Sequence, residues 1–155
     1  NISYYNNRKP LLLGIATDDS HKYHVKSTNY SNTGRGWVMV NSQKIETASL
    51  IKAMETGDFY SSSGVILRKV YHSKEKLFIE VEPKEGVVYE IIFMGYRKGS
   101  YNIEELKRIK GTSSSYTFQE NDLFVRAKIN SNDLIENPYR LGETKQAWVQ
   151  PIVIE

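Results

Sequence analysis

The chain has 155 residues, of which 39% are hydrophobic and 25% charged, and its 21 basic and 18 acidic side chains give a net charge of +3. This composition is typical of a soluble globular protein, and the scattered positive charge favours neither a nucleic-acid nor a membrane partner. The absence of cysteine excludes disulfides, thiolate metal ligands and cysteine nucleophiles, and no apolar run approaches the ~18 residues of a membrane span. The compartment stays open between cytoplasmic and periplasmic or secreted.

The first part of the chain alternates between extended and helical patterns. The apolar run at residues 11–16 predicts a buried strand, and residues 22–35 form a polar loop. Residues 36–40 predict a second strand. Thr47 is the expected N-cap of a helix that runs to about residue 56, and Gly57 is its expected C′ residue, followed by a return to extended chain. Strand, loop, strand, helix and strand together indicate an α/β segment.

From residue 65 the pattern changes to short strands with alternating side chains, separated by turns, which predicts an antiparallel β-sandwich. Residues 103–109 fit either a short helix or an edge strand. We therefore expect an α/β segment at residues 1–66 and a β-sandwich domain at residues 67–155, with no flexible linker between them. The strands are expected at residues 65–71, 77–82, 87–93, 115–118, 123–129 and 147–154.

Two carboxylates and an imidazole follow the first predicted strand. Asp18, Asp19 and His21 come at its C-terminal end, where α/β folds hold their chemistry. Asp19 and His21 are two positions apart, so both side chains can point to the same side and hold one divalent cation. Asp18 is either a further ligand or, as we favour, the acceptor that orients His21. The alternative is that the two aspartates only cap the next turn.

Two residues of the polar loop are candidate substrate contacts. His24 lies three residues after His21, at the mouth of the predicted site, or it is an ordinary solvated histidine. Arg35, together with Lys22, can hold a phosphate or simply balance the charge of the acidic residues. Residues 61–63 are serines, but no base lies near them in sequence, so serine nucleophile chemistry is not expected. No catalytic residue is assigned in this chain.

Several of these stretches resemble one protein family. Residues 14–21, Gly-Ile-Ala-Thr-Asp-Asp-Ser-His, resemble the metal-ligating strand end of the PHP (polymerase and histidinol phosphatase) superfamily of metal-dependent phosphoesterases. Residues 34–40 and 53–64 resemble the barrel-closing segment of one bacterial branch, and residues 124–127 and 147–152 resemble the end of the β-domain that follows it. The resemblance implies an α+β fold, with the end of a PHP-type (β/α)7 barrel followed by a β-sandwich.

The resemblance also implies a function. Asp19 and His21, with Asp18 as a third candidate, would ligate divalent ions (Zn, Mn, Mg or Fe) that act on a phosphate ester or another ester. The family's His-x-His strand, bridging glutamate and other histidine ligands are not in this sequence. We therefore expect a C-terminal fragment that is inactive alone, whose partner is the N-terminal part of the same barrel, and which dimerises through the truncated edge.

The alternative function is a non-catalytic β-sandwich module that binds a glycan or a protein. In that case the tyrosines at positions 89, 96, 101 and 116 would form a sugar-stacking face, although ordinary packing is the explanation that we favour for them. The hydrolase hypothesis predicts an acidic loop at an open edge of the structure. The module hypothesis predicts an exposed aromatic face and an acidic loop closed by its own hydrogen bonds.

Overall fold

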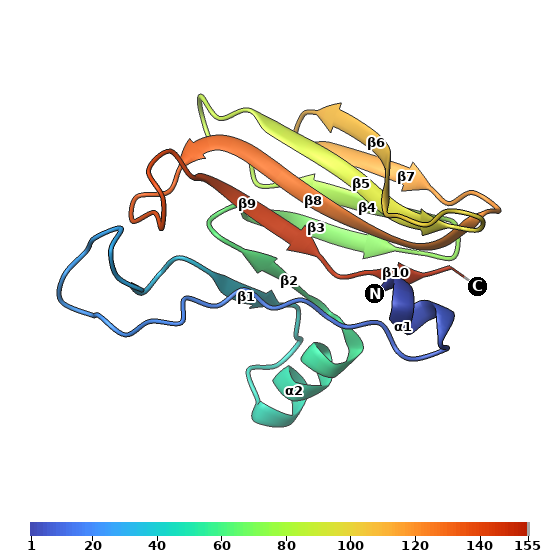
Figure 1. Ribbon diagram of the computed structural model, residues 1–155, viewed down its shortest axis with the longest axis horizontal. Helices are drawn as coiled ribbons and strands as arrows, with labels where there is room; N and C mark the ends of the chain where they lie inside the picture. The colour runs from blue at the N-terminus through green and yellow to red at the C-terminus, as the bar shows by residue number, and fades with distance from the viewer. Residues whose placement is uncertain (155) are drawn as a thin grey trace.

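The chain folds mainly into antiparallel strands that form two stacked sheets (Figure 1). This computed structural model describes residues 1–154. The helices are α1 (Ile2–Asn6) and α2 (Thr47–Thr56), and the strands are β1 (Trp37–Val40), β2 (Phe59–Ser62), β3 (Leu67–His72), β4 (Lys76–Val81), β5 (Tyr89–Arg97), β6 (Glu104–Lys110), β7 (Ser113–Thr117), β8 (Asp122–Leu134), β9 (Thr144–Val149) and β10 (Ile152–Val153). Neither helix is long and apolar enough to cross a membrane.

The larger sheet has the strand order β1-β2-β9-β8-β5-β6, with the short β10 also paired to β8. The smaller sheet has the order β3-β4-β7. Every pairing in both sheets is antiparallel. Because β2 pairs with β9, residues that are 85 to 89 positions apart in the chain share one sheet. The sheet therefore depends on contacts between residues that are far apart in sequence.

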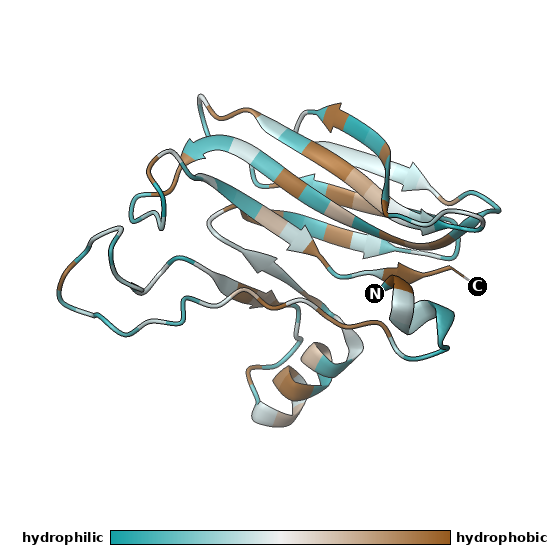
Figure 2. Ribbon diagram, viewed as in Figure 1, coloured by the Kyte–Doolittle hydropathy of each residue, from teal (hydrophilic) through white to brown (hydrophobic). Residues whose placement is uncertain are grey.

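The core lies between the two sheets and follows from side-chain alternation. On β8, Val125, Ala127 and Ile129 are completely buried in this core, where they meet Leu77 and Ile79 of β4. Apolar and polar bands accordingly alternate along β8 (Figure 2). Burial of apolar surface from both sheets, at roughly 25 cal/mol per Å², is what holds the sandwich together.

The N-terminal residues cover part of the other face of the larger sheet. Tyr5 of α1 packs against Tyr96 and Phe124, with ring centroids 6.2 and 6.0 Å apart. Further along, the backbone of Gly14 is bound by two side chains. Gln150 accepts a hydrogen bond from Gly14 N and donates one to Gly14 O, both at 2.8 Å, and Ser61 Oγ also donates to Gly14 O at 2.8 Å.

The predicted PHP-type barrel end is wrong. A barrel of this type needs parallel strands joined by helices, whereas β1 and β2 pair antiparallel with each other and β2 continues antiparallel into β9. The β-sandwich part of the prediction fits the structure. The junction proposed near residue 66 falls in the connection between β2 and β3, and the division into two domains stays a prediction.

Residues 11–16 do not form the predicted buried strand. The segment is extended but unpaired, and Leu12 and Ile15 are 55% and 61% exposed. Only side chains bind its backbone, at Gly14 and at Leu12, whose N–H donates to Asn1 Oδ1 at 2.8 Å. An apolar run predicts an extended chain. It becomes a β-strand only where the edge strand of a sheet is free to pair with it through backbone hydrogen bonds.

The other local predictions agree better with the structure. Thr47 is the first residue of α2 rather than its N-cap, which is Glu46, and Gly57 ends the helix in the left-handed conformation with φ of 82°. Residues 103–109, left open between helix and strand, lie largely in β6 (Glu104–Lys110) at the edge of the larger sheet.

Candidate functional site

The carboxylate of Asp18 is enclosed by the backbone of its own loop. Asp18 Oδ2 accepts a hydrogen bond from the N–H of Gly34 at 2.8 Å, and Oδ1 accepts from the N–H groups of Arg35 and Gly36, both at 2.7 Å. Three successive N–H groups form a concave anion site. Asp18 fills it, so its oxygens are occupied and the loop between residues 18 and 36 is closed by its own hydrogen bonds, which for Asp18 is the outcome that the module hypothesis predicts.

Arg35 holds this loop against the connection between β8 and β9, at the end of the molecule where both loops extend (Figure 1). Its guanidinium donates to the carbonyls of Tyr30, Ser27 and Asn137 at 2.7, 2.9 and 2.9 Å, and it lies over the ring of Tyr139, 5.5 Å from the centroid. The donors of Arg35 are therefore committed to structure. A phosphate could bind here only by displacing these contacts.

Asn32 organises the interior of the loop, a role that the sequence analysis missed. It is 3% exposed. Its Nδ2 donates to the carbonyls of Lys22 and Val25, both at 2.8 Å, and its Oδ1 accepts from the N–H of Ser27 at 2.9 Å. One asparagine in a polar loop carries no sequence signal for this role, because Asn29 in the same loop looks equivalent.

Asp19 and His21 are arranged differently from Asp18. Both are exposed, and Asp19 has a positive φ of 49°, a conformation that non-glycine residues adopt rarely and often at functional sites. His21 Nδ1 lies 2.5 Å from the backbone oxygen of Asp19. A carbonyl oxygen can only accept, so Nδ1 is the donor in this contact, and in the neutral imidazole the lone pair then lies on Nε2. Metal-binding histidines are commonly oriented by this kind of contact.

Asp19 and His21 remain the metal-ligand candidates of this loop, whereas the Asp18 carboxylate is occupied by backbone N–H groups. Among residues 1–154, no group of three or more aspartate, glutamate or histidine side chains lies close enough together to hold a metal ion. His24 is exposed in the same loop. The pair suits two positions of a metal site, and a complete site requires further ligands.

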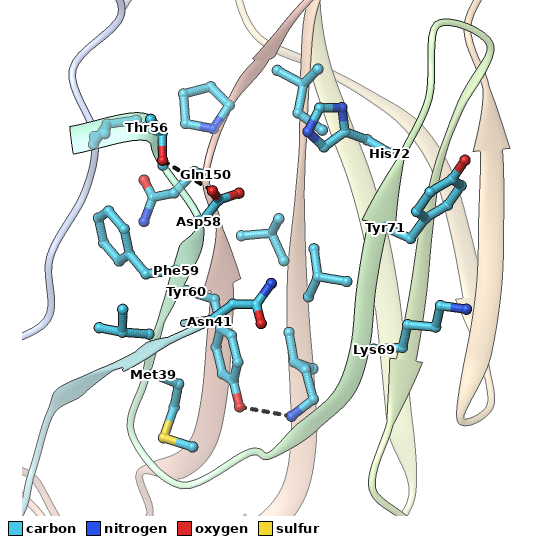
Figure 3. Close-up of a pocket in the computed structure, with 18 of the residues that line it drawn as sticks. Met39, Asn41, Thr56, Asp58, Phe59, Tyr60, Lys69, Tyr71, His72 and Gln150 are labelled. Atoms are coloured by element: carbon cyan, nitrogen blue, oxygen red, sulfur yellow. Dashed lines mark hydrogen bonds between the residues drawn. The ribbon is translucent and has the colours of Figure 1, made fainter. Parts of the chain in front are cut away.

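A separate cleft of about 730 Å³ opens on the side of the sandwich where β3 faces β1, β2 and the turn after β9 (Figure 3). His72 points into it, whereas Lys69 and Tyr71 on the same strand point away. This orientation follows from the register, in which His72 pairs with the buried Leu77. Asn41 and Asp58 also line the cleft, so both apolar and polar side chains face it.

The aromatic face expected of a sugar-binding module is largely buried. Tyr89, Tyr96 and Tyr116 are 6–7% exposed, and only Tyr101, at 91%, is open to solvent. Tyr116 stacks on Phe93 in the core at a centroid distance of 5.9 Å. These tyrosines are packing residues.

The enclosure of Asp18 has an expected consequence for stability. Burial raises the pKa of its carboxyl, but the N–H groups of Gly34, Gly36 and Arg35 and the charge of Arg35 outweigh burial, so the pKa is below its usual value. A pKa that is lower in the folded state gives stability that is present above about pH 4 and is lost as the pH falls through the folded value.

We therefore expect Asp18→Ala to lower the free energy of unfolding by about 1–2 kcal/mol at neutral pH, since it removes charge-assisted hydrogen bonds that are partly open to solvent. The difference between variant and wild type should shrink on acidification below pH 4, which urea unfolding at several pH values measures. Glu120→Gln, an exposed acid changed to its amide, serves as the control. A difference that does not depend on pH would contradict this account.

Comparison of the chain with protein-family models, with curated proteins and with solved structures gives no match. The function is therefore argued from the site.

Proposed function

We propose that this chain is part of a metal-dependent hydrolase, a phosphoesterase, to which it contributes Asp19 and His21 as two metal ligands together with a β-sandwich. The contact between His21 Nδ1 and the carbonyl of Asp19 is the observation that carries the proposal, because in the neutral imidazole it leaves Nε2 available as a metal ligand. A bound divalent cation would act as a Lewis acid on a phosphoryl oxygen.

The roles of the neighbouring residues follow from their contacts. Asp18, locked in its ring of N–H groups, sets the backbone of the loop directly before Asp19. Arg35 ties the same loop to the β8–β9 connection. Both residues act as positioning residues that keep Asp19 and His21 at a defined place on an otherwise polar, extended loop.

The remaining ligands are proposed to lie outside this chain, because two donors bind a divalent ion weakly. The segment that leads into the site supports this arrangement. Leu12 and Ile15 are exposed apolar side chains on extended backbone with no strand beside it. We propose that the rest of the protein packs here, where it would cover this apolar surface and approach the ligand pair.

The test compares metal content and hydrolysis of p-nitrophenyl phosphate for the 155-residue chain and for a longer form that includes residues upstream of it. We expect the 155-residue chain to be inactive and to bind Zn²⁺ or Mn²⁺ weakly, and the longer form to hold metal and to turn over. His21→Ala and Asp19→Asn in the longer form should lower kcat/KM by about 100-fold or more and release metal. Glu120→Gln is the matched control. Metal-free, inactive longer protein would refute the proposal.

A second candidate, a non-catalytic binding module, is favoured by the cleft beside β3. Its volume falls in the range of ligand-binding clefts, and His72 offers a hydrogen-bonding group on its inner wall. Binding of a soluble oligosaccharide or an extended peptide that shifts the His72 ring resonances, in a protein that holds no metal, would support this function over the hydrolase.

A further inference from the structure

Arg126 lies on the outer face of the larger sheet, turned away from the core. Its neighbours on β8, Val125 and Ala127, are completely buried between the two sheets, so alternation directs Arg126 and Lys128 to the opposite face. β8 is an interior strand, flanked by β9 and β5. The side chain of Arg126 therefore starts from the middle of the sheet rather than from an edge.

A pocket of about 230 Å³ surrounds this side chain. It is lined by Gly14, Ile15, Ala16, Ser61, Arg126, Trp148 and Gln150. Arg126 carries the only charge among them. Ser61 and Gln150 direct their polar groups to the backbone of Gly14, and the other walls are apolar or backbone. A guanidinium thus faces a small pocket that contains no counter-charge.

The side chain of Arg126 makes neither a hydrogen bond nor an ion pair to any residue in the described part of the chain, and its Nε is buried without a partner. Burial lowers its pKa, and no neighbouring carboxylate opposes that effect. Lys128 likewise has no ion pair among residues 1–154. By contrast, Arg68, Arg97 and Arg108 each bind a carboxylate. Arg126 is only partly buried, but its Nε has no partner, so an anion that reaches the guanidinium would gain a charge-assisted hydrogen bond.

We propose that this pocket binds a small oxyanion, the phosphate or carboxylate group of a ligand, on the guanidinium of Arg126. The planar guanidinium presents parallel N–H groups that match two oxygens of such an anion. The pocket is smaller than most clefts for whole ligands, so it suits a single anionic group. Lys128 adds positive potential from the same face. The inference uses neither Asp19 nor His21, but Ile15 lines the pocket and also belongs to the apolar surface on which the rest of the protein is proposed to pack.

The test follows the side-chain Nε–Hε resonance of Arg126 in the 155-residue chain during separate titrations with inorganic phosphate and with acetate, at constant ionic strength set with chloride. We expect saturable shifts of the resonance with at least one of the two anions. Saturation with phosphate identifies a phosphate group as the preferred ligand, and saturation with acetate identifies a carboxylate. Arg126→Gln should weaken binding about tenfold or more, equivalent to about 1.4 kcal/mol. Arg140→Gln, which removes an exposed arginine, should bind as the wild type does.

Thermal unfolding gives a second readout. The anion should raise the Tm of the wild type and of Arg140→Gln, and should have a smaller effect on Arg126→Gln. Arg126→Lys keeps the charge but loses the paired N–H groups, so its affinity for the anion should lie between those of the wild type and Arg126→Gln. Absence of any saturable shift with either anion, or equal binding by Arg126→Gln, would overturn the proposal.

Discussion

Asp122→Ala is expected to lower the free energy of unfolding by about 3–5 kcal/mol, because it breaks a buried ion pair and leaves its partners unsatisfied. The Asp122 side chain is completely buried. Its Oδ1 accepts from Arg97 Nε at 2.9 Å, and its Oδ2 accepts from Tyr116 Oη at 2.9 Å. Arg97 Nη2 also donates to Tyr116 Oη at 2.9 Å, which closes the triangle.

This triangle joins the two sheets. Arg97 ends β5 and Asp122 begins β8 in the larger sheet, whereas Tyr116 belongs to β7 in the smaller one. Loss of the carboxylate leaves the Arg97 guanidinium, with 28% of its side chain exposed, beside a buried phenol. The substitution therefore weakens contacts between the two sheets and not only those within one turn.

Urea unfolding followed by circular dichroism measures the effect. Glu82→Ala is the matched control, because Glu82 also pairs with an arginine, Arg68, at 2.7 Å, but both side chains are about half exposed. Exposed pairs contribute little, so this variant should remain close to wild type. Equal losses in Asp122→Ala and Glu82→Ala would show that burial of the triangle adds nothing.

Gly95→Ala is expected to lower the free energy of unfolding by about 2–3 kcal/mol through overpacking. A Cβ at this position in β5 would lie 2.6 Å from the carbonyl oxygen of Phe124 and 2.8 Å from Leu106 Cδ1. The carbonyl belongs to the neighbouring β8, so it cannot move without disturbing the pairing of Gly95 with Val125.

Gly14→Ala is the control for this prediction, since a Cβ there meets nothing within 4 Å. Its effect should stay within about 0.5 kcal/mol, as for most exposed substitutions. Both variants are compared by the same urea titration. A Gly95→Ala protein as stable as Gly14→Ala would mean that β5 and β8 can separate locally at no cost.

The metal-ligand candidates show which features of the candidate site can be predicted from local sequence. Asp18, Asp19 and His21 are adjacent in the chain, so their place in one loop was predictable. The sequence could not show that Asp18, and not Asp19, has its carboxylate bound by backbone N–H groups. Those groups belong to residues 34–36, which come close to Asp18 only in the folded chain, at least 16 residues further on. The contact that frees His21 Nε2 likewise depends on the left-handed turn at Asp19.

The sequence by itself determined the local elements: the alternating strands of the sandwich, and helix α2 with its glycine end. Side chains that alternate between buried and exposed along a strand, and a glycine that adopts a positive φ at a helix end, are both properties of short segments. Only the tertiary structure decided that β2 joins β9, that residues 11–16 stay unpaired, and that Arg126 is left without a counter-ion. Those outcomes depend on which segments meet after long separations in the chain, 85 to 89 residues for β2 and β9, and a local pattern of side chains does not encode its partner.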